Sequence, residues 1–389
     1  MTVKPYPIID ADGHVNEHER IFAESFDPAL EDRRPEIVVL PSGARHWLIE
    51  GKLIPRPLGA RGPGVPTGFH PGGAGMKVAH ARDASLDDVE GRLKDLDQEG
   101  IDVQIIYPST LLAVGFLEDR ALAAAMCRAY NTYVSKRCAV APDRLRWLAS
   151  VPLQDPPEAI KEIRRAVTEL GAVGAVIPGT VGDRTLDQPE FFPFFEEADR
   201  LNVALGIHAL VGSYDTPGQE LFGNFFYAHL VTMPFALMVA AATVIGGGIL
   251  ERLRNLRLAF LETGAGWLPY WSWWLDEHYE KGIYLGRSGT AGAAEGARKY
   301  FKRDPLPYLG TRPSETLFQS RRCFFACEAD EDLSYIARVV GEDNLIAGSD
   351  YPHGDMTPGA FLELMNRKDL SPEFKRKVLH ENPRRLYGL

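Results

Sequence analysis

Eight short apolar runs recur along the 389-residue chain, and amphipathic segments with helical periodicity separate them. The runs are nearly continuous in apolar residues, which is typical of parallel strands that are covered on both faces. They read YPIIDADGH, VQIIYPS, LRWLASVPL, AVGAVIPG, VALGIHA, LRLAFLETG, CFFACEA and NLIAGSDYP. Strands that alternate with helices build a parallel sheet. Eight such repeats predict an α/β fold, a closed (β/α)8 TIM barrel that forms one domain. A doubly wound sheet is the alternative, but no Gly-rich phosphate loop follows the first run.

Two segments interrupt this alternation, at 20–84 and 281–321. In the first, IVVLPSGARHWLIEGKLIP predicts a β-hairpin with turns at Ser42-Gly43 and Gly51-Lys52, and a Gly/Pro-rich loop follows. Long irregular insertions in compact domains are often lids, binding loops or subunit contacts. We therefore expect the 20–84 insertion to cover the barrel mouth or a neighbouring subunit, and the protein to be a homo-oligomer, a dimer or a tetramer.

The composition is that of an ordinary globular protein, with 45% hydrophobic and 25% charged residues. The net charge is −10 and no basic tract offsets it, which argues against a nucleic-acid partner. The longest apolar stretch, MPFALMVAAATVIGGGIL, contains three consecutive glycines and precedes Glu251 and Arg252, so it favours a buried helix over a membrane span. The N-terminus lacks the pattern of a signal peptide. We expect a cytoplasmic protein without a membrane partner.

The first apolar run ends in Asp10, Asp12 and His14, three ionisable residues at alternate positions. Alternate residues of a strand share one face, so the sequence predicts that all three point the same way. A buried row of charge is costly unless protons, hydrogen bonds or a metal compensate it. An Asp-rich turn after a short strand is the alternative interpretation.

Ionisable residues also follow other strands, and in a barrel the carboxyl ends of the strands carry the chemistry. The fifth run ends in His208, the sixth in Glu262 and the eighth in Asp350. The predicted metal ligands are two imidazoles and two carboxylates, a set suited to one divalent ion such as Zn²⁺ or Mn²⁺. They are Asp12, His14, His208 and Asp350.

These motifs, together with LETGAGWLPYWSWWLDEH and the closing NPRRLYGL, resemble the amidohydrolase superfamily. The likeness is to the group that includes aminocarboxymuconate-semialdehyde decarboxylase and the dihydroxybenzoate-type decarboxylases. That family usually opens with His-x-His, whereas this chain has Asp12-Gly13-His14. The fourth run has no lysine for a bridging carbamate, and Glu262 stands where many relatives place a histidine. Both departures indicate one metal ion, and the extra oxygen ligand shifts the preference toward manganese.

The resemblance favours a metal-dependent, non-oxidative decarboxylase of a small aromatic or unsaturated carboxylic acid. The alternative is a hydrolase of an amide, ester or lactone that uses a metal-activated water. A barrel that only binds a small molecule is a third interpretation. In either enzyme Asp350 is the predicted catalytic proton shuttle. Glu262, or His278 on the helical segment after the sixth strand, is predicted to assist it.

Overall fold

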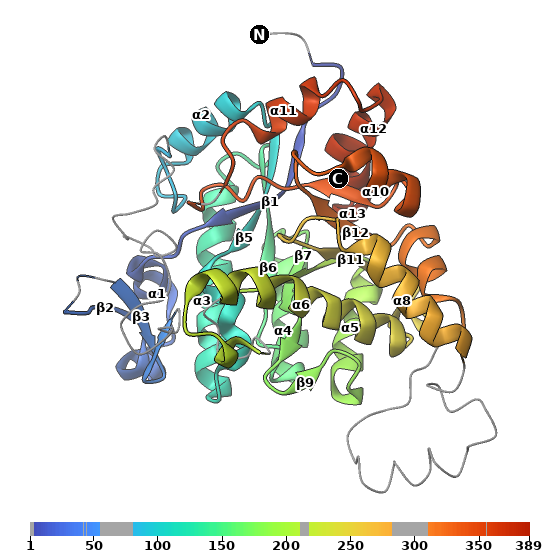
Figure 1. Ribbon diagram of the computed structural model, residues 1–389. Coiled ribbons are helices and arrows are strands. Elements are labelled where there is room, and N and C mark those ends of the chain that lie inside the picture. Colours follow the sequence, from blue (N-terminus) through green and yellow to red (C-terminus); the bar gives the residue numbers. More distant parts are fainter. Residues whose placement is uncertain are drawn as a thin grey trace, which may run out of the picture.

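The computed structural model describes residues 4–41, 43, 45–54, 81–210, 218–281, 310–354 and 356–389. Eight parallel strands form one sheet whose order follows the chain, and helices surround it (Figure 1). The strands are β1 (Ile9–Val15), β5 (Val103–Pro108), β6 (Leu145–Ser150), β7 (Gly174–Pro178), β10 (Ala204–His208), β11 (Arg257–Phe260), β12 (Cys323–Cys327) and β13 (Leu345–Ala347). All eight apolar runs therefore became barrel strands.

The last strand lies beside the first, which closes the sheet. The backbone N–H groups of Ser349 and Asp350 donate to the Asp12 carbonyl at 3.1 and 2.9 Å, and the His14 N–H donates to the Tyr351 carbonyl at 2.7 Å. These bonds place the segment after β13 directly against the end of β1. The predicted (β/α)8 TIM barrel is confirmed.

Helices connect successive strands, as the amphipathic segments predicted. Asp88 caps α2 by accepting from the Gly91 N–H at 2.9 Å, and Gly100 ends that helix at a φ of +76°. The helices are α1 (Glu19–Ser25), α2 (Val89–Glu99), α3 (Arg120–Cys138), α4 (Pro156–Thr168), α5 (Phe192–Leu201), α6 (Phe225–Gly246), α7 (Ile249–Arg252), α8 (Leu268–Lys281), α10 (Leu333–Val340), α11 (Ala360–Asn366), α12 (Pro372–Arg376) and α13 (Asn382–Tyr387).

The barrel interior is a packed core rather than a pore. Side chains from alternate strand positions fill it, among them Ile9, Ile105, Leu148, Val176, Ala259, Phe324 and Ile346. Tyr387 of the C-terminal α13 enters this interior, where its hydroxyl bonds the Tyr107 hydroxyl and the Ala11 carbonyl, both at 2.7 Å. The last helix thus plugs the barrel below the carboxyl ends of the strands.

After α1 and the turn Pro28–Arg33, the described part of the first insertion forms a three-stranded antiparallel sheet of β2 (Glu36–Val39), β3 (Arg45–Ile49) and β4 (Lys52–Ile54). The hairpin prediction is confirmed, although Ser42 of its first turn lies outside the described residues. The second turn is Glu50-Gly51, one residue earlier than predicted. A two-residue hairpin loop of type I′ needs positive φ at both central residues, and these two have φ of +52° and +72°.

This small sheet packs beside the loop that follows β5. The Glu50 carboxylate accepts from the backbone N–H groups of Glu118 and Asp119 at 3.1 and 2.6 Å. That loop leaves the carboxyl end of a barrel strand, so the sheet stands on the predicted side of the barrel. The Gly/Pro-rich loop (55–80) and most of the second insertion (282–309) lie outside the described residues. Coverage of the mouth therefore stays a prediction.

Most of the longest apolar stretch lies in α6, which ends at the Gly247 cap, as predicted, and its last two residues begin α7. Among the described residues, α6 alone is long and apolar enough to cross a bilayer by length and composition. Half of its most apolar 18-residue window is buried inside the protein, which is common for a core helix.

Candidate metal centre

Two buried histidines meet at the carboxyl ends of β1 and β10. His14 Nδ1 is 2.9 Å from the Pro108 carbonyl, and His208 Nδ1 is 2.7 Å from the Ala209 carbonyl. A carbonyl only accepts, so Nδ1 carries the proton in both rings and the Nε2 lone pairs are left for another partner. The rings lie edge to face with centroids 5.1 Å apart. In metal-binding histidines one ring nitrogen typically binds the ion while the other donates its N–H to a carbonyl or carboxylate, as Nδ1 does here.

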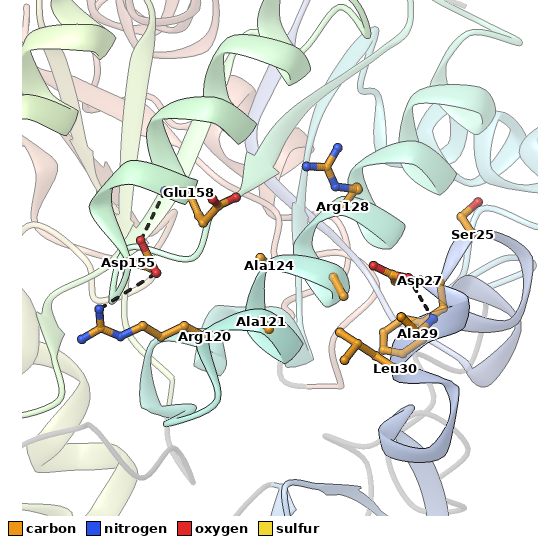
Figure 2. Close-up of a pocket in the computed structure, with 12 residues that line it drawn as sticks. Ser25, Asp27, Ala29, Leu30, Arg120, Ala121, Ala124, Arg128, Asp155 and Glu158 are labelled. Carbon is orange, nitrogen blue, oxygen red and sulfur yellow. Dashed lines mark hydrogen bonds and ion pairs between the residues drawn. The ribbon is translucent and has the colours of Figure 1, made fainter.

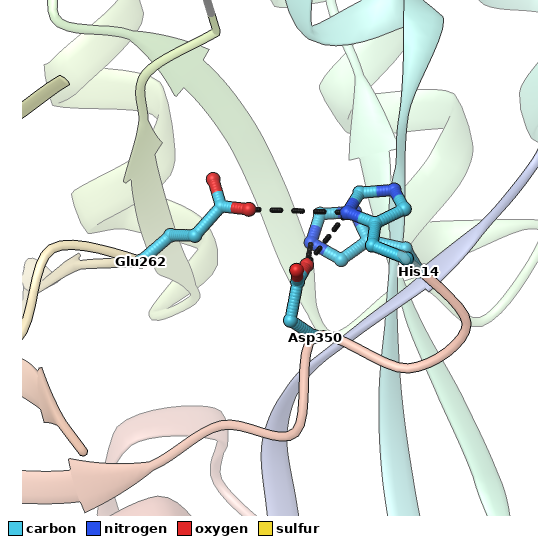
Figure 3. A group of neighbouring side chains, drawn as sticks. His14, Glu262 and Asp350 are labelled. Carbon is cyan, nitrogen blue, oxygen red and sulfur yellow. Dashed lines mark ion pairs between the residues drawn. The ribbon is translucent and has the colours of Figure 1, made fainter. Parts of the chain in front are cut away.

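Carboxylates surround these two nitrogens. His14 Nε2 lies 3.5 Å from Asp12 Oδ1 and 3.2 Å from Asp350 Oδ1. His208 Nε2 lies 3.7 Å from Asp12 Oδ2 and 3.4 Å from Glu262 Oε2. Figure 3 shows the Asp350 carboxylate directed toward His14, and the Glu262 carboxylate directed toward the same group of side chains. Two ligands that each lie about 2.0–2.2 Å from one ion, at angles of about 90–110°, are separated by about 2.8–3.6 Å. Three of the four observed spacings fall in this range, and the fourth, at 3.7 Å, lies just above it.

Several of these atoms are buried without a hydrogen bond. Within the part of the chain that the structure describes, this holds for Asp12 Oδ1, His14 Nε2 and His208 Nε2. An unsatisfied buried polar atom costs about 1–3 kcal/mol, so three that face one point indicate a missing partner. A divalent cation would satisfy all three at once, and the residues present fit such an ion.

The charges lead to the same conclusion. Burial, with the nearby charges of Glu262 and Asp10, raises the pKa of Asp12 well above its usual value. Burial lowers the pKa of His208, and burial together with the neighbouring His353 and His208 lowers the pKa of His14 well below its usual value. Both histidines are thus held in the neutral form that binds metals, and a bound cation would favour the ionised form of Asp12.

The prediction that Asp10, Asp12 and His14 share one face is wrong for Asp10. The register between β1 and β5 shifts between Asp10 and Gly13, and this bulge breaks the alternation. Asp10 instead accepts from the Ser349 N–H and hydroxyl at 2.8 and 2.6 Å, and from Gln104 Nε2 at 2.8 Å. Its role is to tie β1 to the segment after β13, behind the ligand groups.

Backbone strain marks the two carboxylates that come from loops. Glu262 and Asp350 have φ of +66° and +55°, a region that residues with a side chain rarely adopt. Such strain costs about 1–3 kcal/mol and clusters at functional sites. Both residues follow the end of a barrel strand, and their strained backbone aims the two carboxylates at the histidines.

His353 joins this group, although the sequence indicated no firm role for it. Its Nδ1 is 2.6 Å from Asp350 Oδ1 and 3.8 Å from Glu262 Oε1, and its ring stacks on His14 with centroids 4.1 Å apart. The signal in the sequence was its position three residues after Asp350. Whether the loop turned back toward the site depended on the tertiary fold.

His278 is the predicted catalytic residue that the structure does not bring together with the predicted metal ligands. It lies on α8, where its Nδ1 is 2.9 Å from the Trp274 carbonyl and its ring meets the Trp274 indole at 4.5 Å. A catalytic role for His278 stays a prediction, whereas Asp350 and Glu262 stand together with the predicted ligands.

A cavity of about 660 Å³ lies elsewhere, between the turn Pro28–Arg33 and the helices α3 and α4 (Figure 2). Its lining includes Leu30, Arg120, Arg128 and Asp155. None of the predicted site residues lines it, so it is separate from the metal centre.

A (β/α)8 barrel whose strand ends bring imidazoles and carboxylates together defines the class of barrel metalloenzymes. The sequence profile of the family described as Amidohydrolase matches residues 9–389. The chain therefore belongs to the amidohydrolase family, and the resemblance seen in its motifs is confirmed.

Relatives of known activity support this assignment. A 2-amino-3-carboxymuconate-6-semialdehyde decarboxylase of Dictyostelium discoideum is 26% identical over 79% of this chain and 78% of its own length. A gamma-resorcylate decarboxylase of Rhodococcus jostii is 37% identical over 49% of this chain and 60% of its own length.

Among solved structures, a 5-carboxyvanillate decarboxylase from Novosphingobium aromaticivorans, complexed with manganese, has a TM-score of 0.67 at 20% identity. The match covers 99% of this chain and 97% of that one. At that identity the likeness shows the fold alone.

Proposed function

We propose that this protein is a metal-dependent, non-oxidative decarboxylase of a small aromatic or unsaturated carboxylic acid. The observation that carries the proposal is the buried group of Asp12, His14 and His208, whose ligand atoms all lie within 4.8 Å of one another. Asp350 Oδ1 adjoins this group, 3.2 Å from His14 Nε2. The relatives named above favour decarboxylation over the alternative, hydrolysis by a metal-activated water.

The proposed ligands of one divalent ion are the four residues predicted from the sequence, Asp12, His14, His208 and Asp350. Mn²⁺ is favoured over Zn²⁺ because half of this set, and Glu262 beside it, offers oxygen. When bound, such an ion holds an anionic substrate through its oxygens and polarises it.

Side chains of the protein then supply the proton that the reaction needs. Asp350 is the proposed acid: it delivers a proton to the carbon that bears the substrate carboxylate. The bond between that carbon and the carboxylate breaks, its electron pair stays on the substrate, and carbon dioxide leaves. Glu262, whose Oε2 lies 3.4 Å from His208 Nε2, is the proposed assisting group and would act through its other oxygen. Positioned acid catalysis of this kind contributes about 10²–10⁴-fold to a rate.

The partner that fits this chemistry is a small organic acid. Nucleic acid and membrane partners are not proposed, and the proposed location is the cytoplasm. We also propose that the chain works as one barrel domain in a homo-oligomer. Large apolar side chains on α6 and α8 support an interface between copies, since each is more than half exposed. They are Phe226, Tyr227, Leu230, Phe235, Tyr270 and Trp273.

The test uses purified protein loaded with Mn²⁺ and a panel of hydroxybenzoates, amides and lactones. We expect carbon dioxide from at least one hydroxybenzoate, with a proton in place of its carboxylate, and a loss of activity with a chelator that added Mn²⁺ restores. Acid production from an amide or lactone without carbon dioxide release would instead support the hydrolase.

A further inference from the structure

His353 is held at both of its ring nitrogens beside the metal centre. Nδ1 forms an ion-pair contact of 2.6 Å with Asp350 Oδ1, and Nε2 lies 2.6 Å from the Ser109 hydroxyl oxygen. The imidazole also stacks on His14, with an angle of 25° between the ring planes. With 10% of its side chain exposed, His353 has little freedom to turn.

Ser109 is itself fixed in place. Its hydroxyl lies 3.0 Å from the Val15 carbonyl, at the end of β1. Its backbone N–H donates at 3.1 Å to the buried carboxylate of Glu17, which also accepts from the N–H groups of Thr110 and Leu111. Ser109 follows directly after β5, so two barrel strands anchor the group that holds His353.

Asp350 is the predicted metal ligand that His353 contacts. It lies in a loop at a φ of +55°, three residues beyond the end of β13, and its Oδ1 is the atom that faces His14 Nε2 at 3.2 Å. A carboxylate on a loop can rotate about its own bonds unless a neighbour fixes it. Groups that orient a metal ligand typically change metal affinity or activity about 10–100-fold when they are removed.

We propose that His353 is a positioning residue. Its Nδ1 forms the ion-pair contact with Asp350 Oδ1 and thereby holds the Asp350 carboxylate in the orientation that serves the metal, while Ser109 fixes the ring from the other side. This inference rests on the proposed metal site. It does not depend on which acid the enzyme decarboxylates, because the role concerns the ligand and not the substrate.

Two amide variants separate the two nitrogens of the ring. In His353→Asn the amide nitrogen takes the place of Nδ1, and in His353→Gln it reaches toward the place of Nε2. His353→Phe keeps a ring to stack on His14 but loses both polar contacts. His380→Phe is the matched control, since His380 contacts the Pro7 carbonyl near the amino-terminal side of β1.

The readout is Mn²⁺ affinity of the metal-stripped proteins, measured from the electron paramagnetic resonance of free Mn²⁺, with thermal unfolding as a check of the fold. We expect His353→Phe and His353→Gln to bind Mn²⁺ about 10–100-fold more weakly than the parent. His353→Asn should stay within about threefold of the parent, and His380→Phe should equal it.

Parent-like affinity in His353→Phe would overturn the proposal, because stacking alone would then suffice. A loss in His353→Asn equal to that in His353→Phe would also overturn it, since the Nδ1 donor would not be the feature that matters. A parent that binds Mn²⁺ but releases no carbon dioxide from any acid would remove the proposed decarboxylase activity and leave this result standing. A parent that binds no Mn²⁺ would refute both.

Discussion

The substitution Gly13→Ala tests how the chain positions its first two ligands. A Cβ at Gly13 would lie 2.2 Å from Gln104 Nε2 and 2.5 Å from its Cδ, far inside a normal contact. Gln104 is fully buried, donates to Asp10 Oδ2 at 2.8 Å and accepts from Arg92 Nη1 at 2.9 Å. Both partners are charged side chains in the interior.

The alanine must displace the Gln104 amide and break these two bonds. Each hydrogen bond to a charged group is worth about 1.5–3 kcal/mol, so full loss would cost about 3–6 kcal/mol. Partial relaxation and the lower entropy of the unfolded alanine chain, about 0.4–1 kcal/mol, reduce this figure. We expect the free energy of unfolding to fall by about 3 kcal/mol. Metal affinity should fall as well, because Gly13 lies between Asp12 and His14.

The assay is urea unfolding at pH 7 followed by circular dichroism, for the parent, Gly13→Ala, Gln104→Ala and the double variant. In the Gln104→Ala background the new methyl group has room, so Gly13→Ala should cost less than about 1 kcal/mol there. The expected coupling between the two sites is about 2 kcal/mol. Equal costs of Gly13→Ala in both backgrounds would refute the argument, because the clash with Gln104 would not be the cause.

Three further outcomes are expected. His208→Ala should lose bound metal and activity together, as shown by metal analysis after dialysis. Asp350→Asn should lower turnover at least about 10²-fold with Mn²⁺ retained or modestly weakened, and turnover within a few-fold of the parent would exclude the proton-shuttle role. Hydrogen bonds from Arg200 and Arg164 lower the pKa of Glu197 to about 2. The ionised carboxylate therefore stabilises the folded state fully above the ordinary glutamate pKa, and this contribution is lost as the pH falls through about 2. Glu197→Gln should therefore lower the free energy of unfolding at pH 7 by no more than about 1 kcal/mol, since both arginines are more than half exposed, and the difference in urea midpoint should shrink at pH 3.

The barrel and most of the ligand set could be predicted from the sequence, because both depend on local patterns. A parallel strand that is covered on both faces must be apolar throughout, so an ionisable residue at its end is conspicuous. His208 closes β10 in this way, and His14 lies near the end of β1, two residues after Asp12 in the middle of that strand. The barrel then places the carboxyl ends of all strands on one rim, which is why residues far apart in the chain could be assigned to one site.

Only the tertiary structure decided where the remaining side chains point. Strict alternation along β1 would place Asp10 on one face with Asp12 and His14. A bulge that depends on pairing with β5 instead directs the Asp10 side chain away from those two residues. The positive φ of Glu262 and Asp350 and the return of His353 to the site are set by packing against other strands, which no local pattern records. The sequence by itself determined which residues stand at the rim of the barrel. The structure decided which of them face one point, because bulges and loop turns are fixed by contacts between segments distant in the chain.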